Sequence, residues 1–296
     1  MKILVIIVTF NGIRWIRKCL SSVKEYDTFV IDNGSTDGTQ QAVQSEFPNV
    51  MFRQNAKNLG FGMANNIGMK YAITNGYDYV YLMNQDAWIL PNTINTLISA
   101  IQKHPDYGIL SPMQMQDGLD HFDSIFGMKV LTWESSKQLM EDWFHSRKRD
   151  LYEVPFVMAA HWLISSKCIK QVGIFSPSFP HYGEDDNYID RARFHGFKTG
   201  IVLEAKAVHD RVEYNQWSKP KQIYINNYII PLKKLSNINN SGNPWPVILK
   251  NAFTYPFLFK SLKPIGYLFR LLKEYPTIKR NRELSKQQGM FLNTYA

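Results

Sequence analysis

The side chains with the most chemical potential in this sequence are carboxylates, and three of them are adjacent at residues 184–186, in the run GEDD. Adjacent carboxylates disfavour each other's ionisation, so one of them should have a raised pKa and serve as a base near neutral pH. Asp86 ends the triplet Asn-Gln-Asp after an apolar run, where a carboxylate could bind a hard divalent cation. His209 could add a neutral imidazole ligand. Each residue also has a purely structural explanation, as a helix cap, a solvated first turn or a buried histidine.

Two further segments favour nucleotide binding. Asp32 begins the run DNGSTDGT, and its carboxylate, beside Thr9 and Asn11, could accept the imide N–H of a uracil or thymine ring. In the segment NLGFG, Gly60 and Gly62 would let the backbone approach a ligand, and the helix that follows would offer N–H groups to phosphate. Each segment alone is weak evidence, because turns of the same composition are common.

Alternating strands and helices are needed to bring these residues together. Short β-branched runs alternate with helical periodicity over the first hundred residues, which predicts a parallel, doubly wound sheet. Ligands of such sheets bind at the carboxyl ends of the strands, where all these polar clusters fall. We expect strands at about residues 3–8, 28–31, 50–53 and 79–83, with a helix after each, the last of them capped by Asn92.

The pattern weakens after Pro112, where we expect irregular loops and mixed strands. Order returns at residues 155–165, which predict one or two strands before a short helix ended by Gly173. A further helix begins at GEDD and ends at Gly196, and its acidic first turn suits the helix dipole.

Composition excludes several classes of protein. With 45% hydrophobic and 20% charged residues in 296, the chain can bury a core and is not intrinsically disordered. The two cysteines, Cys19 and Cys168, fit a reducing compartment, so we expect a cytoplasmic protein. The chain has a net charge of +9, of which residues 211–296 supply +11, with 14 Lys and Arg against 3 Asp and Glu, so a nucleic-acid-binding core is not expected. No apolar stretch reaches the roughly 18 residues needed to span a bilayer.

In their order along the chain, these segments resemble the family 2 glycosyltransferases, and most closely the rhamnosyltransferase-like branch that builds bacterial surface polysaccharides. The resemblance covers about residues 1–210 and implies a GT-A fold, a UDP- or dTDP-sugar donor, Mg²⁺ or Mn²⁺, and inversion at the anomeric carbon. The Q-x-x-R-W motif of processive synthases is absent, which favours transfer of one sugar per encounter. The segments are VTFNG, DNGSTDGT, NLGFGMANNIGMKYA, YLMNQDAWI, VMAAHWLI with VGIF, GEDDNYIDRARFHG and KAVHD.

The resemblance also implies a role for individual residues. Asp185 would be the catalytic base, and Asp86 and His209 would bind the metal ion. Asn84 stands where the family often has an acid, and Asn187 stands at the last acidic position, so Asp186 is an extra carboxylate without an assigned role. The donor would be held by Thr9, Asn11, Asp32, Asn58, Gly60, Asn84 and Arg191.

We expect a GT-A catalytic domain at residues 1–212, with a nucleotide-binding half at 1–111 and an acceptor-binding half at 112–212. Residues 213–296 would be a basic, aromatic, mostly helical extension that either contacts the inner face of a membrane beside a lipid-linked glycan acceptor or packs on the catalytic domain. Two alternatives remain open. One is an inactive nucleotide- or glycan-binding module; the other is a nucleotidyltransferase, which would need a basic residue in the loop TFNG.

Overall fold

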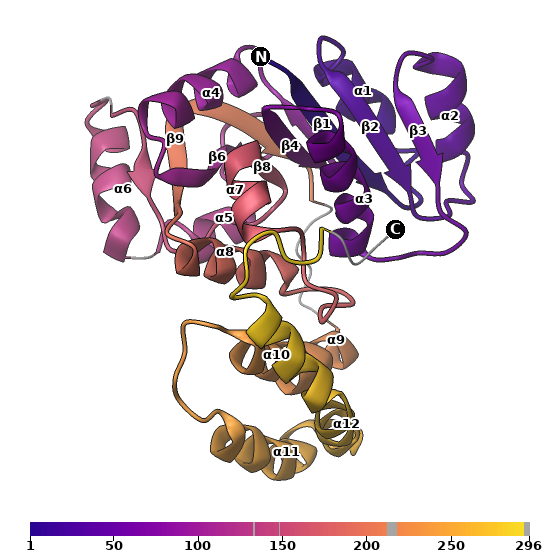
Figure 1. Cartoon of the computed structure of the whole chain (residues 1–296), viewed down its shortest axis with the longest axis vertical. Coiled ribbons are helices and arrows are strands. Elements are labelled where there is room, and N and C mark those ends of the chain that lie inside the picture. The colour runs from indigo at the N-terminus through magenta and orange to yellow at the C-terminus, as the bar shows by residue number, and fades with distance from the viewer. Residues whose placement is uncertain (133, 148, 212–217, 293–296) are drawn as a thin grey trace.

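The computed structural model describes residues 1–132, 134–147, 149–211 and 218–292. In these residues a nine-stranded mixed sheet with helices on both faces is followed by a separate group of C-terminal helices (Figure 1). The strand order is β3-β2-β1-β4-β8-β6-β9-β5, and β7 also pairs with β9. The predicted α/β class with a doubly wound mixed sheet is confirmed.

The N-terminal part alternates strands and helices as predicted. Strands β1 to β4 are parallel, with β1 between β2 and β4, so the loops after them meet at one edge of the sheet. Asn92 stands before α4 in a left-handed conformation, with φ of 66°, and its side chain makes no capping hydrogen bond, so the predicted cap is wrong. The elements are β1 (Ile3–Thr9), α1 (Ile16–Ser22), β2 (Asp27–Asp32), α2 (Thr39–Glu46), β3 (Met51–Gln54), α3 (Phe61–Thr74), β4 (Tyr79–Asn84), β5 (Ala87–Ile89) and α4 (Thr93–Lys103).

The next part mixes antiparallel and parallel pairing. Strand β8 is antiparallel to both β4 and β6, and β9 is parallel to β6. Two short helices, α5 and α6, occupy the region where loops were predicted, because Ile125, Phe126 and Leu139 are buried in the core. Helices α7 and α8 end as predicted, before Gly173 and Gly196 with positive φ. The elements are β6 (Tyr107–Met115), α5 (Ser124–Lys129), the 3-10 helix η1 (Glu134–Ser136), α6 (Lys137–Phe144), β7 (Tyr152–Glu153), β8 (His161–Ser165), α7 (Ser166–Val172), α8 (Glu184–Phe194) and β9 (Lys198–His209).

The sheet is buried on both faces. Successive residues of β1 point to opposite faces, so Leu4 and Ile6 join one hydrophobic core while Val5 and Ile7 join the other. Helices α3, α7 and α8 contribute to the first core, and α1, α2 and α4 contribute to the second. This explains why β1 is a continuous apolar run, which is typical of parallel strands covered by helices on both sides.

The C-terminal helices have a hydrophobic core of their own, to which the part with the sheet contributes Phe179. Lys233 also pairs with Asp186, and Ile174 N–H donates to the carbonyl of Met290, so the end of the described chain returns to the sheet domain. None of the described helices is both long and apolar enough to cross a membrane. The predicted boundary after residue 212 lies outside the described residues and stays a prediction. The elements are α9 (Lys219–Tyr224), the π-helical turn η2 (Ile225–Ile229), α10 (Ile230–Ser236), α11 (Trp245–Phe259) and α12 (Lys263–Leu284).

Candidate active site

Thr9 and Asp32 lie side by side, because the parallel register of β1 and β2 pairs them. Asp32 is fully buried and accepts four hydrogen bonds. Thr9 Oγ1 donates to it at 2.8 Å, and the backbone N–H groups of Gly34 and Ser35 donate at 3.1 and 2.8 Å. The fourth donor is the Ser35 hydroxyl. In this state Asp32 therefore orders the loop between β2 and α2.

Asn11 ties the loop after β1 to the same turn. Its backbone N–H donates to Ser35 Oγ at 2.8 Å, and its side-chain Oδ1 accepts from the Thr36 N–H at 2.9 Å. Asn11 has a φ of 50°, a left-handed conformation that asparagine tolerates better than most residues. Hydrogen bonds thus join the two loops that are predicted to hold a nucleotide.

Asn58 and Gly60 form the next loop along this edge. Asn58 Oδ1 accepts the Gly60 N–H at 2.8 Å, and Asn33 Nδ2 donates to the Gly60 carbonyl at 3.3 Å. A Cβ atom at Gly60 would lie 2.4 Å from the carbonyl oxygen of Pro180, so glycine is required there by a close approach as well as by its φ of 80°. At Gly62 a Cβ atom would be 3.2 Å from Phe175 and 3.5 Å from Glu184, which is less close. The loop of Asn58 and Gly60 is therefore adjacent to the segment that precedes α8.

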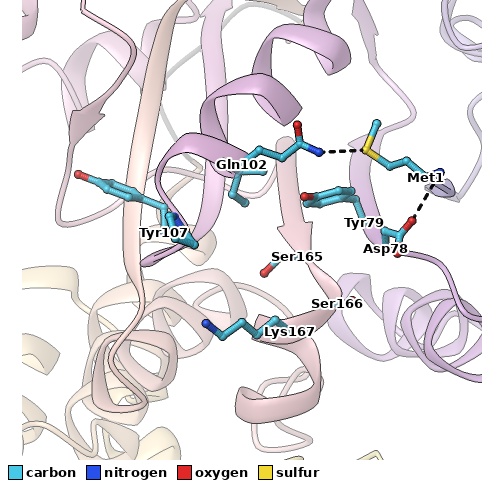
Figure 2. Close-up of a pocket in the computed structure, with 10 residues that line it drawn as sticks. Met1, Asp78, Tyr79, Gln102, Tyr107, Ser165, Ser166 and Lys167 are labelled. Atoms are coloured by element: carbon cyan, nitrogen blue, oxygen red, sulfur yellow. Dashed lines mark hydrogen bonds and ion pairs between the residues drawn. The ribbon is translucent and has the colours of Figure 1, made fainter.

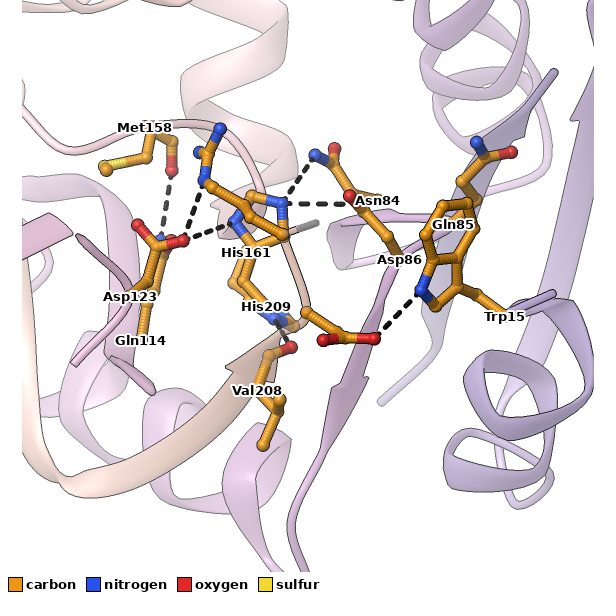
Figure 3. Close-up of polar contacts among 12 residues, drawn as sticks. Trp15, Asn84, Gln85, Asp86, Gln114, Asp123, Met158, His161, Val208 and His209 are labelled. Atoms are coloured by element: carbon orange, nitrogen blue, oxygen red, sulfur yellow. Dashed lines mark hydrogen bonds and ion pairs between the residues drawn. The ribbon is translucent and has the colours of Figure 1, made fainter. Parts of the chain in front are cut away.

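Asp86 and His209 converge at the end of β4, because the antiparallel pairing of β5 and β9 places Ala87 opposite His209. His209 Nε2 lies 3.4 Å from Asp86 Oδ1 and 3.3 Å from Asn84 Nδ2 (Figure 3). His209 is buried, whereas the Asp86 side chain is 25% exposed. Burial opposes ionisation of Asp86, but the hydrogen bond and charge of His209 outweigh it and lower the pKa of that carboxyl.

Asp123 lies behind His209 and was not identified from the sequence. Its Oδ2 atom is 3.4 Å from His209 Nδ1 (Figure 3) and accepts a hydrogen bond of 2.7 Å from Arg211 Nε. Its Oδ1 atom accepts the Phe126 N–H at the start of α5. The side chain is fully buried. His209 Nδ1 has no hydrogen-bond partner within the described residues, and a carboxylate beside it is placed to orient an imidazole that binds a metal ion through its other nitrogen. The only signal in the sequence was an aspartate that could begin a helix.

Gln85 and His161 hold this edge together. Gln85 Oε1 accepts the Phe10 N–H at 2.8 Å and Gln85 Nε2 donates to the Phe10 carbonyl, which joins the donor loop to the end of β4. His161 is buried, 2.9 Å from both the Tyr81 hydroxyl and the Val208 carbonyl oxygen. Burial lowers the pKa of His161 to about 3, so it is a neutral structural residue.

Glu184, Asp185 and Asp186 form the first turn of α8 as predicted. Asp185 is half-buried, and burial together with the charge of Asp186 raises its pKa to about 6. Glu184 is nearly fully buried, its Oε2 atom has no hydrogen-bond partner, and burial raises its pKa to about 8. Asp186 pairs with Lys233 of α10, which gives this extra carboxylate a structural role.

Arg191 is not part of this cluster. It is fully buried, and its two terminal nitrogens donate to the carbonyl oxygens of Ile174 and Val172, at the end of α7. The guanidinium group also lies over the ring of Phe291. Arg191 therefore holds α7 and the end of the described chain against α8, and it does not face the predicted donor site.

A hollow of about 600 Å³ lies at the opposite edge of the sheet, near the N-terminus of the chain (Figure 2). It is lined by Asp78, Tyr79 and Gln102, among others, and by none of the predicted site residues. Parallel α/β sheets bind ligands at the carboxyl ends of their strands, so we place the site at the edge that holds Thr9, Asn84 and Asp86.

Relatives of this chain are glycosyltransferases. A protein named N-acetylglucosaminyl-diphospho-decaprenol L-rhamnosyltransferase, from Mycobacterium tuberculosis, is 25% identical over 215 residues, which cover 65% of this chain and 69% of the relative. The low-salt glycan biosynthesis hexosyltransferase Agl10 of Haloferax volcanii is 23% identical over 225 residues, which cover 75% and 71% of the two chains.

Similar solved structures show the same fold. S. aureus TarS 1–349 in complex with UDP-GlcNAc has a TM-score of 0.56 at 16% identity, with 97% of this chain and 90% of that chain covered. The mannosyltransferase PcManGT of Pyrobaculum calidifontis, in complex with GDP-Man and Mn²⁺, has a TM-score of 0.54 at 16% identity, covering 96% and 85%. GalNAc-T7 with UDP, GalNAc and Mn²⁺ has a TM-score of 0.59 at 15% identity, and this chain covers 57% of its length.

The sequence model of the family described as glycosyl transferase family 2 matches residues 4–173, more than half of the chain. The matched segment contains Thr9, Asp32, Asp86 and Asp123, while Asp185 and His209 follow it. On this evidence the chain belongs to glycosyl transferase family 2 and has the GT-A fold.

Proposed function

We propose that this glycosyltransferase is metal-dependent and inverting, and that it transfers one sugar per encounter from a UDP- or dTDP-sugar to a hydroxyl of a glycan or lipid-linked glycan in surface-polysaccharide synthesis. The proposal rests on one observation: Asp86 and His209 lie together beside the loops that follow Thr9 and Asp32, which are joined by hydrogen bonds. The start of α8, with Asp185, lies near the first turn of α3, where a Cβ atom added at Gly62 would be 3.5 Å from the Cβ atom of Glu184.

The residues around Asp86 fit a divalent cation. Asp86 Oδ1 and His209 Nε2, which lie 3.4 Å apart, would hold the ion with Nε2 unprotonated and the imidazole proton on Nδ1, the atom that faces Asp123. Asn84 Oδ1 is buried without a hydrogen-bond partner among the described residues, so a further oxygen beside His209 would be available to the ion. Oxygen donors with one imidazole suit Mg²⁺ or Mn²⁺. Such an ion neutralises charge on a departing diphosphate.

The donor would lie along the loops that follow β1, β2 and β3. Asp32 and Asn11 shape the turn that would receive the base and ribose, with Thr9 at its floor. Gly60 would bring the backbone close to the diphosphate, and the N-terminus of α3 would offer its free N–H groups. Asn58 holds that loop in shape by its bond to the Gly60 N–H.

Asp185 would remove the proton from the acceptor hydroxyl. Its raised pKa gives it a proton affinity suited to a general base near neutral pH, which ordinary aspartate lacks. Attack by that oxygen on the anomeric carbon, opposite the leaving diphosphate, inverts the configuration. The printed name of the Mycobacterium tuberculosis relative describes a lipid-linked acceptor, and we propose an acceptor of that class here.

A donor panel tests this proposal. Thermal shifts with UDP-, dTDP- and GDP-sugars, with and without Mn²⁺, should show stabilisation by a UDP- or dTDP-sugar, of roughly 2.7 kcal/mol at 100 times its Kd. Asp86→Asn should abolish the Mn²⁺-dependent part, while Asp150→Asn, at an exposed ion pair with Lys103, should leave it intact.

Transfer to a lipid-linked acceptor completes the test. Transfer should stop in EDTA and return with Mn²⁺ or Mg²⁺. Full activity in EDTA would contradict the metal site, and donor binding without transfer or donor hydrolysis would favour an inactive binding module.

A further inference from the structure

The helices α11 and α12 expose an unusual number of large apolar side chains. Eight of the sixteen large hydrophobic residues that are exposed in the described chain lie between residues 245 and 273. Phe257 is 84% exposed, Leu262 76% and Leu258 71%, and all three lie at the turn between the two helices. Figure 1 shows α11 and the start of α12 at the end of the molecule farthest from the sheet. The other five are Val247, Leu249, Phe253, Phe269 and Leu272.

The turn is built by residues that face inward, which leaves its outer side free. Ile248 and Ala252 hold α11 against the core of the C-terminal helices. The turn itself is made by Lys260, in a left-handed conformation with φ of 47°. Between the helices lies a hollow of about 500 Å³, lined mainly by Phe253, Pro256, Phe257, Leu262 and Ile265. A contiguous apolar surface of this kind on a soluble domain marks an interaction site.

The charge of the same region is entirely positive. Residues 245–273 contain five basic side chains and no acidic one. Lys260 and Lys263 flank the apolar turn and are exposed. Arg270 is less available to an external partner, because it pairs with Glu274 and lies over the ring of Tyr228. The others are Lys250 and Lys273.

We propose that the turn between α11 and α12 docks onto the surface of an anionic membrane. Phe257, Leu258 and Leu262 enter the boundary between headgroups and acyl chains, and Lys260 and Lys263 meet the headgroup phosphates. A second copy of the chain is a poorer occupant, because a symmetric contact would bring the basic residues of two turns against one another, and Glu274, the nearest acid along the chain, already pairs with Arg270.

The helices that carry the docking surface also contact the proposed site. Leu232 of α10 and Leu271 of α12 share one hydrophobic core, and Lys233 of α10 pairs with Asp186, next to the proposed base Asp185. An acceptor lipid in a bilayer docked at the turn would approach α8 from the side of these helices. This last point rests on the proposed function, whereas the docking itself does not.

Vesicle flotation of the full chain tests the docking. The wild type should bind vesicles that contain phosphatidylglycerol at least about tenfold more tightly than pure phosphatidylcholine vesicles, and added salt should weaken that binding. The double variant Phe257→Ser with Leu258→Ser should lose about tenfold or more in partitioning. The matched control is Phe144→Ser on α6, because Phe144 is also 84% exposed but lies in the catalytic part.

A charge variant separates the two contributions. Lys260→Glu with Lys263→Glu should abolish the preference for anionic vesicles, because each basic residue near such a surface contributes about 1 kcal/mol, or roughly fivefold. Equal binding of the wild type and the Phe257 double variant would overturn the proposal. A dimer in solution that this double variant dissociates, without vesicle binding by the wild type, would assign the surface to self-association instead. Donor binding is measured in parallel, so failure of the docking is distinguishable from failure of the proposed function.

Discussion

Asp32 and Asp185 are the same residue type on two sides of the proposed site, and their surroundings differ. Asp32 is fully buried among four hydrogen-bond donors from Thr9, Gly34 and Ser35. Asp185 is half-buried, accepts the Asp186 N–H at 2.9 Å, and has carboxylates as its neighbours on the helix. Donors stabilise a negative charge, whereas burial and like charge raise the affinity for a proton. The surroundings suit Asp32 to ordering a loop and Asp185 to accepting a proton.

The two sides also differ in how completely their buried polar atoms are paired. Thr9 and Asp32 have partners for their side-chain oxygens. On the side of the proposed metal ion and base, Asn84 Oδ1, Glu184 Oε2 and Asn187 Oδ1 are buried without a partner in the described chain. Unpaired buried groups reduce stability and are retained where ligands bind or reactions occur. We infer that the loops after β1 and β2 are ordered before a donor binds, and that ligands would complete the edge with Asn84 and Glu184.

Asp185→Asn should give the largest effect. Asparagine preserves the shape of the side chain but lacks its basicity, so kcat should fall by about 10²–10⁴ while the Kd of the donor stays the same. Single-turnover kinetics with calorimetric donor binding would measure both. Asp190→Asn is the matched control, because burial also raises the pKa of Asp190, on the same helix, to about 6. Near-normal turnover of Asp185→Asn would move the base to Glu184 or Asp186.

Asp123→Asn should have a smaller effect that acts through His209. Loss of the carboxylate should weaken Mn²⁺ binding in the presence of UDP by about 10–100-fold, measured by the electron paramagnetic resonance signal of free Mn²⁺. Activity should recover at high Mn²⁺. Asparagine can still accept the Phe126 N–H, so the start of α5 is preserved. Unchanged Mn²⁺ affinity with a lowered melting temperature would show that Asp123 serves only α5 and Arg211.

The arrangement of the first strands was predictable from the sequence, because β1 is a continuous apolar run, β2 and β4 have apolar centres, and α1 and α3 repeat their apolar residues at helical spacing. Asp86, His209 and the acidic turn of α8 were found from their type and position. Strand β5 has three residues, too few for a periodic pattern, and it pairs with a strand more than a hundred residues away. Asp123 was missed for a similar reason, since only the folded chain brings it to His209. The motif led us to place Arg191 at the donor, because the sequence does not show which way this helical side chain faces.

Glu184→Gln should have the smallest effect, and on stability rather than transfer. Because burial raises the pKa of Glu184 to about 8, the folded protein binds this proton more tightly than the unfolded chain does. Its contribution therefore becomes less favourable as pH rises from the ordinary glutamate range through about 8. The neutral variant should be more stable than the wild type at about pH 8.5, by about 1 kcal/mol or more, and this gain should shrink at about pH 5. Urea unfolding at both values measures it, and a gain independent of pH would contradict the assignment.

The pH dependence of kcat/KM tests most directly whether its surroundings make Asp185 a base. The base must be unprotonated to act, so kcat/KM for the wild type should fall as pH drops through about 6, where burial and the charge of Asp186 place the pKa of Asp185. Because the two carboxylates interact, the measured value belongs to the pair. A profile that stays flat down to the ordinary aspartate range, near pH 4, with donor binding intact, would contradict the account.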